Sequence, residues 1–273
     1  LRQHREAHHL QLARAAYNYR RNRAFLGHTW AEFDDLPSQS TIAKGQGGSS
    51  NRRGSAPKKE MEAPPSFPEN RIIDLLFKGF HIGKRHNYRD MLITLLMNGA
   101  GFRSSEPFHL YLWDVKEDPL NSGQALVLIH HPAWGNAPPD QLWRDLNGKQ
   151  RRGNRAQYLA ERFGTAPRNW GRSKASAGWK GGMHESTFGG YYKQAYWFVP
   201  EFGRLFWQIW QIYMEQVSRI NPSQRNHPYA FVNIFRSPVG EPYKLGQFEA
   251  SHEAAVRRIG LEPAQHLGTN RHG

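Results

Sequence analysis

The chain has 273 residues, enough for one large domain or two smaller ones, and its 37 Lys and Arg against 23 Asp and Glu give a formal net charge of +14. Such a charge fits an ordinary basic protein but favours a polyanionic partner, nucleic acid first, because each cation that meets a phosphate releases condensed counterions. The lack of cysteine excludes disulfides, cysteine-ligated zinc and thiol nucleophiles and fits a reducing cytoplasm, and no apolar run approaches the ~20 residues of a membrane span.

Two segments at the start of the chain differ in composition. Residues 4–26 carry apolar side chains near helical spacing among many Arg and His residues, which predicts a helix that is either solvated or laid along DNA phosphates. Residues 38–68 are rich in Gly, Ser, Pro, Lys and Arg and lack an apolar period, so they predict a flexible basic linker. Both ends of the chain break off inside expected elements, and we expect the sequence to be a fragment of a longer protein.

A compact region is expected from residue 69 onward. Apolar spacing predicts helices over 69–80 and 87–98, the second ended by Gly99 and Gly101, and a third helix is expected over 104–113. The side chains expected to face the core are Ile72, Ile73, Leu76 and Phe80 in the first helix and Tyr88, Met91, Leu92, Leu95 and Leu96 in the second.

Strands and a polar insertion are expected next. Branched side chains predict strands over 125–131 and 193–200. The polar residues 132–176 between them predict an insertion with one helix over 139–146.

The last part of the chain is expected to be mainly helical. Residues 200–220 carry an unbroken apolar stripe, which we assign to core packing rather than to a cofactor site. An extended segment over 229–235 and a helix over 246–259 follow. The predicted fold class is therefore mainly α with a small antiparallel β-sheet, an α+β fold.

Arg103 and Glu106 stand where a leucine-rich helix ends and the next one is expected to begin. Glu106, three residues further on, lies on the same helical face as Arg103 and can hold its guanidinium. A guanidinium fixed in this way suits a phosphate, because its planar fork binds two non-bridging oxygens at once. The alternative is a surface ion pair without function, worth under ~1 kcal/mol.

The order of features over residues 69–273 resembles the tyrosine recombinase (phage integrase) family. In that family a leucine-rich helix runs into Thr-Gly-Leu-Arg, then a small residue and Ser-Glu-Leu, and the first catalytic box ends near Trp-x-Asp. The residues of this chain that match the box are Gly101, Phe102, Arg103, Ser105, Glu106, Trp113 and Asp114. The chain departs from the family at Pro107, which replaces an apolar residue, and in the long insertion over 132–176.

The same resemblance assigns a lysine and a histidine. The family's three-stranded sheet presents a lysine at a β-turn, which Lys180 in Gly-Trp-Lys-Gly-Gly matches, with Lys174 and Lys193 as alternatives. A second box, His-x-x-Arg, begins where His272 stands, so the second arginine and the tyrosine nucleophile are expected beyond Gly273. None of the earlier tyrosines is assigned as the nucleophile, among them Tyr213, Tyr229 and Tyr243.

The resemblance implies an enzyme of site-specific DNA recombination or integration. A tyrosine would attack a phosphodiester to form a 3′-phosphotyrosine, and the freed 5′-hydroxyl would attack a partner strand, with neither cofactor nor metal ion. Arg103 would bind the non-bridging oxygens and Lys180 would protonate the 5′-oxygen. His272 would assist proton transfer, and Glu106 would orient Arg103. The implied partners are double-stranded DNA and further copies of the chain, four in a synapse, in the bacterial cytoplasm.

The resemblance also divides the chain into domains. Residues 1–37 would be the C-terminal part of a helical core-binding domain, residues 38–68 the linker, and residues 69–273 a catalytic domain incomplete at its C-terminus. The two domains would form a clamp around duplex DNA. We therefore expect the chain as it stands to bind DNA without cleaving it.

Two other functions stay open. A non-catalytic DNA-binding or architectural protein would explain the charge and the linker, but not the order of Arg103, Lys180 and His272. A metal-dependent nuclease is suggested by 14 histidines, including the pair His130-His131. Neighbouring residues of a strand point to opposite faces, however, and the sequence holds neither an HExxH motif nor paired acidic ligands at metal spacing.

Overall fold

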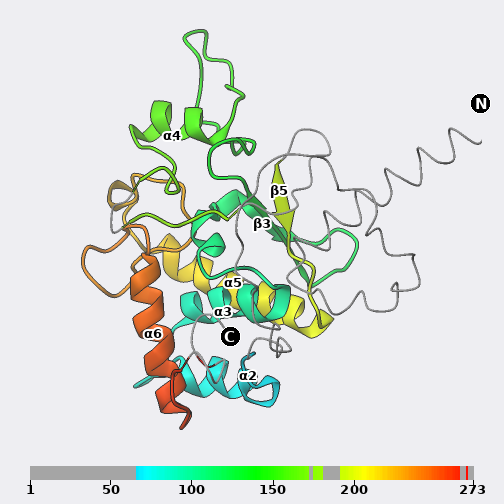
Figure 1. Ribbon diagram of the computed structural model, residues 1–273. Coiled ribbons are helices and arrows are strands. Elements are labelled where there is room, and N and C mark those ends of the chain that lie inside the picture. Colours follow the sequence, from blue (N-terminus) through cyan, green and yellow to red (C-terminus); the bar gives the residue numbers. More distant parts are fainter. Residues whose placement is uncertain (1–65, 172–174, 181–190, 265–268, 270–273) are drawn as a thin grey trace, which may run out of the picture. The chain divides into compact units, whose positions relative to one another are not determined.

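The structure is a computed structural model that describes residues 66–171, 175–180, 191–264 and 269. All of them belong to the second of two compact units of the chain, residues 61–273. In this part of the chain the fold is mixed α+β and mostly helical, with five α-helices and two small antiparallel sheets (Figure 1). The predicted fold class is confirmed at this level. The predictions for residues 1–37, and for nearly all of 38–68, lie outside the described residues.

The first helical run changes its hydrogen-bond pattern along its length. It begins as a 3-10 turn over Glu69–Arg71, continues as α2 over Ile72–Asp74 and widens to a π-helix over Leu75–Gly79. The predicted helix is confirmed, but the inward position given to Ile73 is wrong, because this side chain is 51% exposed. Residues 72, 75, 76 and 79 form the buried stripe, at the i, i+3, i+4, i+7 spacing that leaves position 73 on the outer face.

A short hairpin leads into the central helix. Strands β1 (His81–Ile82) and β2 (Arg85–His86) pair antiparallel. Helix α3 follows over Tyr88–Ala100, and the side chain of Asn87 caps its N-terminus by accepting from the Asp90 N–H. The prediction for 87–98 is confirmed, and all four aliphatic residues named for its inner face are buried, while Tyr88 is partly buried.

The helix predicted over 104–113 is wrong. Two separate 3-10 turns occupy this stretch, Glu106–His109 and Leu112–Asp114, with extended backbone between them. One tertiary partner and one local side chain take up backbone groups that a continuous helix would need. The Ala230 N–H donates to the Leu110 carbonyl at 2.8 Å, and the Tyr111 N–H donates to the Asp114 carboxylate at 2.7 Å.

The larger sheet has the order β3-β4-β5, all antiparallel. Its strands are β3 (Val115–Glu117), β4 (Ala125–His130) and β5 (Tyr192–Gln194). The strand predicted over 125–131 is confirmed, with every second side chain buried. The strand predicted over 193–200 is wrong beyond Gln194. The chain turns away from β4 there, and the Phe198 N–H donates to the Gly99 carbonyl near the end of α3.

The insertion between β4 and β5 holds a helix in another place than predicted. Residues 139–146 form turns and one isolated bridge, and the Asp140 carboxylate accepts the Leu142 N–H within the first turn. Helix α4 instead spans Arg155–Phe163 and begins at a capping box formed by Asn154 and Gln157. The sequence Asn-x-x-Gln was available as a helix-start signal.

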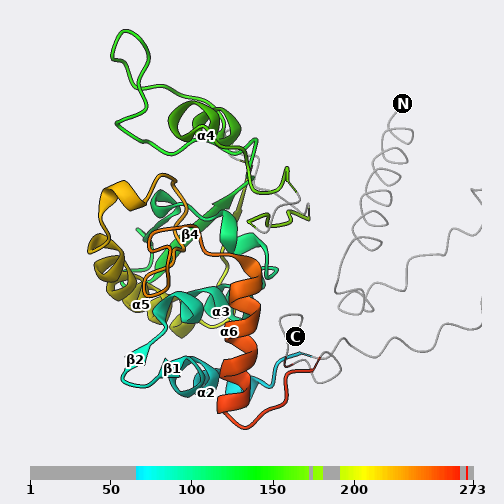
Figure 2. The same ribbon diagram turned by 90° about the vertical axis from the view of Figure 1, so that its left-hand side faces the viewer.

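Two long helices complete the fold, and both predictions are confirmed. Helix α5 spans Pro200–Ser218 and packs along α3, and α6 spans Leu245–Arg258 and packs on α3 and on the π-helical turn (Figure 2). Together with β3, β4 and the segment around Phe231 they enclose one large apolar cluster, here called the main core. The apolar stripe predicted for 200–220 lies in it. In the described part of the chain, no helix has the length and apolar character needed to cross a membrane.

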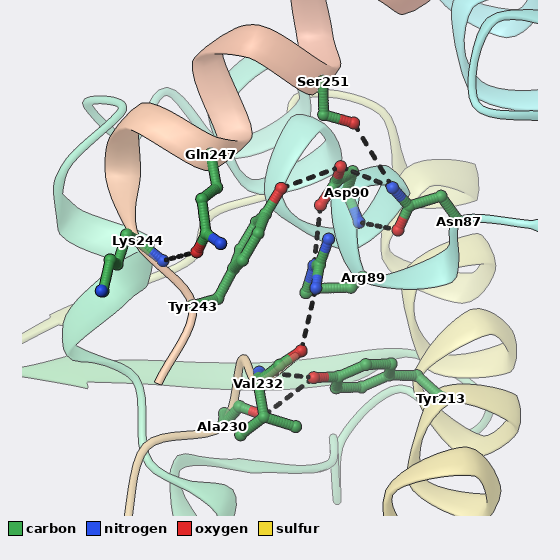
Figure 3. A network of polar contacts seen from close by, with 10 residues as sticks. All are labelled: Asn87, Arg89, Asp90, Tyr213, Ala230, Val232, Tyr243, Lys244, Gln247 and Ser251. Carbon is green, nitrogen blue, oxygen red and sulfur yellow. Dashed lines mark hydrogen bonds and ion pairs between the residues drawn. The ribbon is translucent and has the colours of Figure 1, made fainter. Parts of the chain in front are cut away.

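A buried polar network joins α3, α5 and the segment that leads into α6 (Figure 3). The Asp90 carboxylate accepts from Arg89 Nε at 2.9 Å, from Asn87 Nδ2 at 2.6 Å and from the Tyr243 hydroxyl at 3.2 Å. Arg89 also donates to the Val232 carbonyl at 2.9 Å and lies over the Tyr243 ring at 3.3 Å. The network therefore satisfies a buried charge pair and fixes the three segments to one another.

Candidate functional site

Arg103 follows the C-terminus of α3 across a left-handed turn. Gly101 has φ +69° and ends the helix, with its N–H bonded to the Met97 carbonyl and the next N–H, of Phe102, bonded to the Leu96 carbonyl. Phe102 is buried, whereas the Arg103 side chain is 50% exposed. The helix end thus presents a guanidinium to solvent from a fixed backbone position.

Glu106 holds Arg103 through its backbone. One carboxylate oxygen, Oε2, accepts the Arg103 N–H at 3.0 Å, while the Arg103 carbonyl accepts the Glu106 N–H at 2.9 Å. The guanidinium itself lies 4.0 Å from Oε1. Glu106 is therefore a positioning residue for the main chain of Arg103, and the side-chain contact expected from the sequence is the looser of the two.

Lys193 of β5 makes the short contact to Glu106. Its Nζ donates to Oε1 at 2.5 Å, and the two side chains are 15% and 3% exposed. The ammonium also lies 4.9 Å from the centre of the Trp179 ring. Lys193 thus neutralises a buried carboxylate, and its own side chain is mostly buried.

Lys180 comes to the same place from the end of the insertion. Arg103 Nη1 donates to the Lys180 carbonyl at 2.8 Å, joining two residues 77 positions apart, and the Lys180 side chain is exposed. Arg103, Glu106, Lys180 and Lys193 are here called the cationic cluster. It holds three cations and one carboxylate, a formal surplus of two positive charges at the surface.

Arg168 fastens the segment that carries Lys180, and sequence reasoning missed it. Its guanidinium is buried and donates to three main-chain carbonyls, at 2.7, 3.0 and 2.8 Å, and burial lowers its pKa to about 10. The Ala177 N–H in turn donates to the Arg168 carbonyl at 3.1 Å. No apolar period or motif marks Arg168, so only the folded chain identifies it. The acceptors are the carbonyls of Ala175, Phe108 and Tyr243.

His109 and Trp179 pack beneath the cationic cluster. The two rings meet edge to face at 5.4 Å, and His109 Nε2 lies 3.4 Å from the Gly178 carbonyl, to which a neutral ring can donate. Burial, aided by the charge of Arg168, lowers the pKa of His109 to about 3. His109 is therefore neutral at physiological pH, and it supports the site without adding a charge.

The last residues of the sequence motif, Trp113 and Asp114, lead away from the cluster. The Asp114 carboxylate accepts from Arg155 Nη2 at 2.5 Å, and the pair is buried, with 4% and 1% of the two side chains exposed. Arg155 further donates to the His109 carbonyl at 3.2 Å. This pair fixes the start of α4 to the turn that follows Arg103 and Glu106.

The remaining site predictions fall partly outside the described residues. His272 and Lys174 lie outside them, so the structure brings together only Arg103, Glu106, Lys180 and Lys193. Tyr213, Tyr229 and Tyr243 are buried, and burial raises the pKa of Tyr213 and of Tyr229 to about 12. The Tyr213 hydroxyl donates to the Ala230 carbonyl and the Tyr243 hydroxyl to the Asp90 carboxylate, so both are bonded inside the fold.

The histidine pair at the end of β4 is split by the strand. His131 is buried, and its Nδ1 accepts the N–H groups of Ala133 and Trp134 at 3.1 and 3.0 Å. His130 is half-buried and packs on Tyr192 of β5. Within the ranges that the structure covers, no three or more His, Asp or Glu side chains are grouped as metal ligands.

The chain was compared with models of protein families, with curated proteins and with solved structures, and none of the three comparisons found a match.

Proposed function

We propose that this chain is the major part of the catalytic domain of a tyrosine-type site-specific DNA recombinase or integrase. The observation that carries the proposal is the contact of Arg103 with the Lys180 main chain, because the two cations singled out in the sequence share one exposed surface. The chain order supports it as well: the arginine box, a three-stranded antiparallel sheet, a lysine before the last strand, and two long helices.

In the proposed reaction a tyrosine oxygen attacks the phosphorus of a DNA phosphodiester. The bond to the 5′-oxygen breaks, a 3′-phosphotyrosine forms, and the leaving 5′-oxygen takes up a proton. Negative charge grows on the non-bridging oxygens, so fixed cationic donors are the main requirement. Arg103 would supply these donors, exchanging its contact with the Lys180 carbonyl for the phosphate.

Lys180 is the lysine that we propose as the general acid. Lys180 is exposed and its main-chain carbonyl accepts from Arg103, whereas the Lys193 ammonium is bonded to the buried Glu106. A proton donor has to reach the leaving oxygen, which lies outside the protein surface. Lys193 would then keep Glu106, and through it the Arg103 main chain, in position. His272 keeps its proposed role in proton transfer, and the nucleophile keeps its proposed place after Gly273.

Covalent trapping tests the function. The complete gene product is incubated with a nicked duplex from which the freed strand diffuses away, so that a covalent protein–DNA adduct accumulates. We expect Arg103→Ala to lower adduct formation by about 10²–10³-fold, the cost of removing one oxyanion donor, while most DNA affinity remains. Arg204→Ala on the exposed face of α5 is the matched control and should react as the parent protein. Unchanged cleavage in Arg103→Ala, or cleavage abolished by EDTA, would contradict the proposal.

A substrate with a 5′-bridging sulfur tests the lysine. A thiolate leaves without being protonated, so the loss of a general acid should be rescued by sulfur, whereas the loss of a positioning residue should not. We expect Lys180→Met to recover most of its cleavage rate on this substrate and Lys193→Met to recover little. The reverse pattern would assign the general acid to Lys193.

A further inference from the structure

The insertion carries an arm whose role the proposed reaction leaves unexplained. Residues 141–152, here called the arm, form the loop that extends beyond α4 in both views (Figures 1 and 2). Its two sides pair at an antiparallel bridge between Arg144 and Gln150, and the Arg151 N–H donates to the Trp143 carbonyl at 2.9 Å. The arm is thus a hairpin, with the residues between positions 145 and 149 at its tip.

The tip is held by its own polar groups. The Asp145 carboxylate accepts the N–H groups of Asn147 and Lys149, both at 2.9 Å, and Gly148 supplies the left-handed residue of the turn at φ +75°. Arg144 donates to the carbonyls of Gln141 and Gly148 at 2.8 and 2.6 Å. These bonds fix the conformation before any partner binds, which lowers the entropy cost of binding.

The base of the arm is anchored in a second apolar cluster, here called the small core. Its buried members are Tyr111, Trp143, Tyr158, Leu159 and Tyr229. Trp143 is 4% exposed, packs edge to face on Tyr158 at 5.3 Å, and donates its indole N–H to Glu161 at 2.9 Å. The small core also contains Tyr111, so it joins the base of the arm to the segment that follows Arg103 and Glu106.

The exposed surface of the arm is basic. Its twelve residues hold four cations and one carboxylate, a formal charge of +3, and that carboxylate, Asp145, is occupied by the turn. Arg151 is paired with Glu161 at 3.1 Å, while Lys149 and Arg152 are exposed. Cations at the surface of a preformed hairpin suit the phosphates that border a groove of DNA.

Leu146 stands at the tip with its side chain fully exposed, at 106%. Proteins that bend DNA bind the minor groove with cationic side chains and insert apolar side chains between base steps, and an exposed Leu at the tip of a basic hairpin suits this mode. We propose that the arm is a second DNA contact, in which Lys149 and Arg152 bind phosphates and Leu146 enters the minor groove. The proposal rests on the proposed function for its partner, and it adds to it a site away from the scissile phosphate.

Salt titration of duplex binding tests the phosphate contacts in the full chain. Each lost contact makes the negative slope of log K against log salt shallower by about 0.9, so Lys149→Gln/Arg152→Gln should reduce its magnitude by about 2 and weaken binding roughly 50-fold at 0.1 M salt. The matched control is Lys84→Gln/Arg236→Gln, which removes two exposed cations near the β1–β2 hairpin, at the end of the structure away from the arm (Figure 2). Equal losses in the two double variants would overturn the proposal.

Base unstacking tests the wedge. A mixed-sequence duplex containing 2-aminopurine should gain fluorescence when the parent chain binds, and Leu146→Ala should remove most of that gain while weakening binding by less than about 10-fold. Leu142→Ala is the control, because Leu142 is also exposed, at 72%, but lies closer to the base of the arm. An unchanged fluorescence gain in Leu146→Ala would overturn the wedge.

The outcomes separate this inference from the proposed function. A parent chain that binds duplex and arm variants that bind equally well would overturn the arm alone. A parent chain that fails to bind duplex at low salt would overturn both. Arm variants that change the sedimentation of the DNA-free chain and leave DNA binding intact would make the arm a contact between copies, which also overturns the proposal.

Discussion

The main core and the small core are built by different means. The main core gathers aliphatic and aromatic side chains from α3, α5, α6 and the sheet, and the charged groups inside it form the network around Asp90. The small core has five buried members, four of them aromatic with a polar atom, and two buried arginines, Arg155 and Arg168, lie against its tyrosines. Apolar area stabilises the first core, whereas satisfied charges are essential to the second.

The two cores bear on how the residues of the cationic cluster are held in place. Arg103 leaves the main core at the end of α3, so its backbone is set by well-packed apolar contacts. The segment that carries Lys180 is held by Arg168, which donates to the carbonyls of Phe108 and Tyr243 in the main core and lies over the Tyr229 ring of the small core. The two cores can be perturbed by separate substitutions, and the predictions below use this, from the largest expected effect to the smallest.

Breaking the buried charge pair should be the most damaging change. Arg155→Met keeps much of the side-chain volume but leaves the Asp114 carboxylate buried without its cation, which costs about 3–5 kcal/mol. Because the contacts of Arg155 lie around α4, hydrogen exchange should accelerate first in the amides of α4 and the arm. The exposed pair Arg219–Glu215 is the control, and Arg219→Ala should cost under about 1 kcal/mol.

A double variant decides whether the charge is the cause. Arg155→Met/Asp114→Asn removes the uncompensated charge while keeping a side-chain oxygen for the Tyr111 N–H. Its free energy of unfolding should recover part of the loss seen in Arg155→Met. An additive or larger loss in the double variant would mean that packing, not the buried charge, explains the first result.

Truncating the main core should act on the whole domain instead. Leu92 of α3 is fully buried, and Leu92→Ala should lower the free energy of unfolding by about 2–5 kcal/mol through lost burial and the cavity left behind. Urea unfolding measures this loss of free energy. Amide hydrogen exchange should accelerate together in α3, α5 and α6. Acceleration limited to α4 would contradict the division into two cores.

Acid should weaken the domain through its buried histidines. Burial lowers the pKa of His252 to about 4, against an opposing effect of Asp90 and Glu253, so between about pH 6.5 and pH 4 the unfolded chain binds the extra proton. Stability is therefore complete above about pH 6.5 and falls as the pH drops toward 4, by up to about 3 kcal/mol for His252. His252→Leu should reduce the slope of unfolding free energy against pH, and His81→Leu, at an exposed histidine, should leave it unchanged.

The cap of α3 should show the smallest effect. Gly101→Ala places a Cβ at φ +69° and 3.0 Å from the Phe198 ring, which should cost about 1 kcal/mol or slightly more. Gly246→Ala is the control, since an added Cβ there meets open space inside α6, and it should be neutral or slightly stabilising. Thermal unfolding measures both variants. Equal effects would mean that the left-handed turn is not the cause.

Sequence periodicity predicted the main core well. The helices over 69–80, 87–98, 200–220 and 246–259 were found because a long amphipathic helix repeats one burial pattern many times. Ile73 was misplaced because two neighbouring isoleucines look equivalent in the sequence, while only one of them continues the buried stripe.

Sequence periodicity could not predict the small core or the long-range contacts of the cationic cluster. The stretch after Arg103 looks helical in sequence, but the Leu110 carbonyl accepts from the distant Ala230 N–H and the Leu112 N–H donates to the distant Pro228 carbonyl. Arg103 and Glu106 were found through their spacing, whereas the link from Lys193 to Glu106 joins positions 87 apart. Long-range pairs between charged residues leave no periodic trace, so they emerge only from the folded chain.

The way in which Arg168 is held has a consequence for how this domain can diverge. Its three acceptors are main-chain carbonyls, which every amino acid supplies. These hydrogen bonds therefore require an arginine at position 168 but no particular side chain at the three acceptor positions. The insertion can therefore change in sequence and length while a single arginine keeps its end attached. Homologues could share this fastening and yet have little recognisable similarity between β4 and β5.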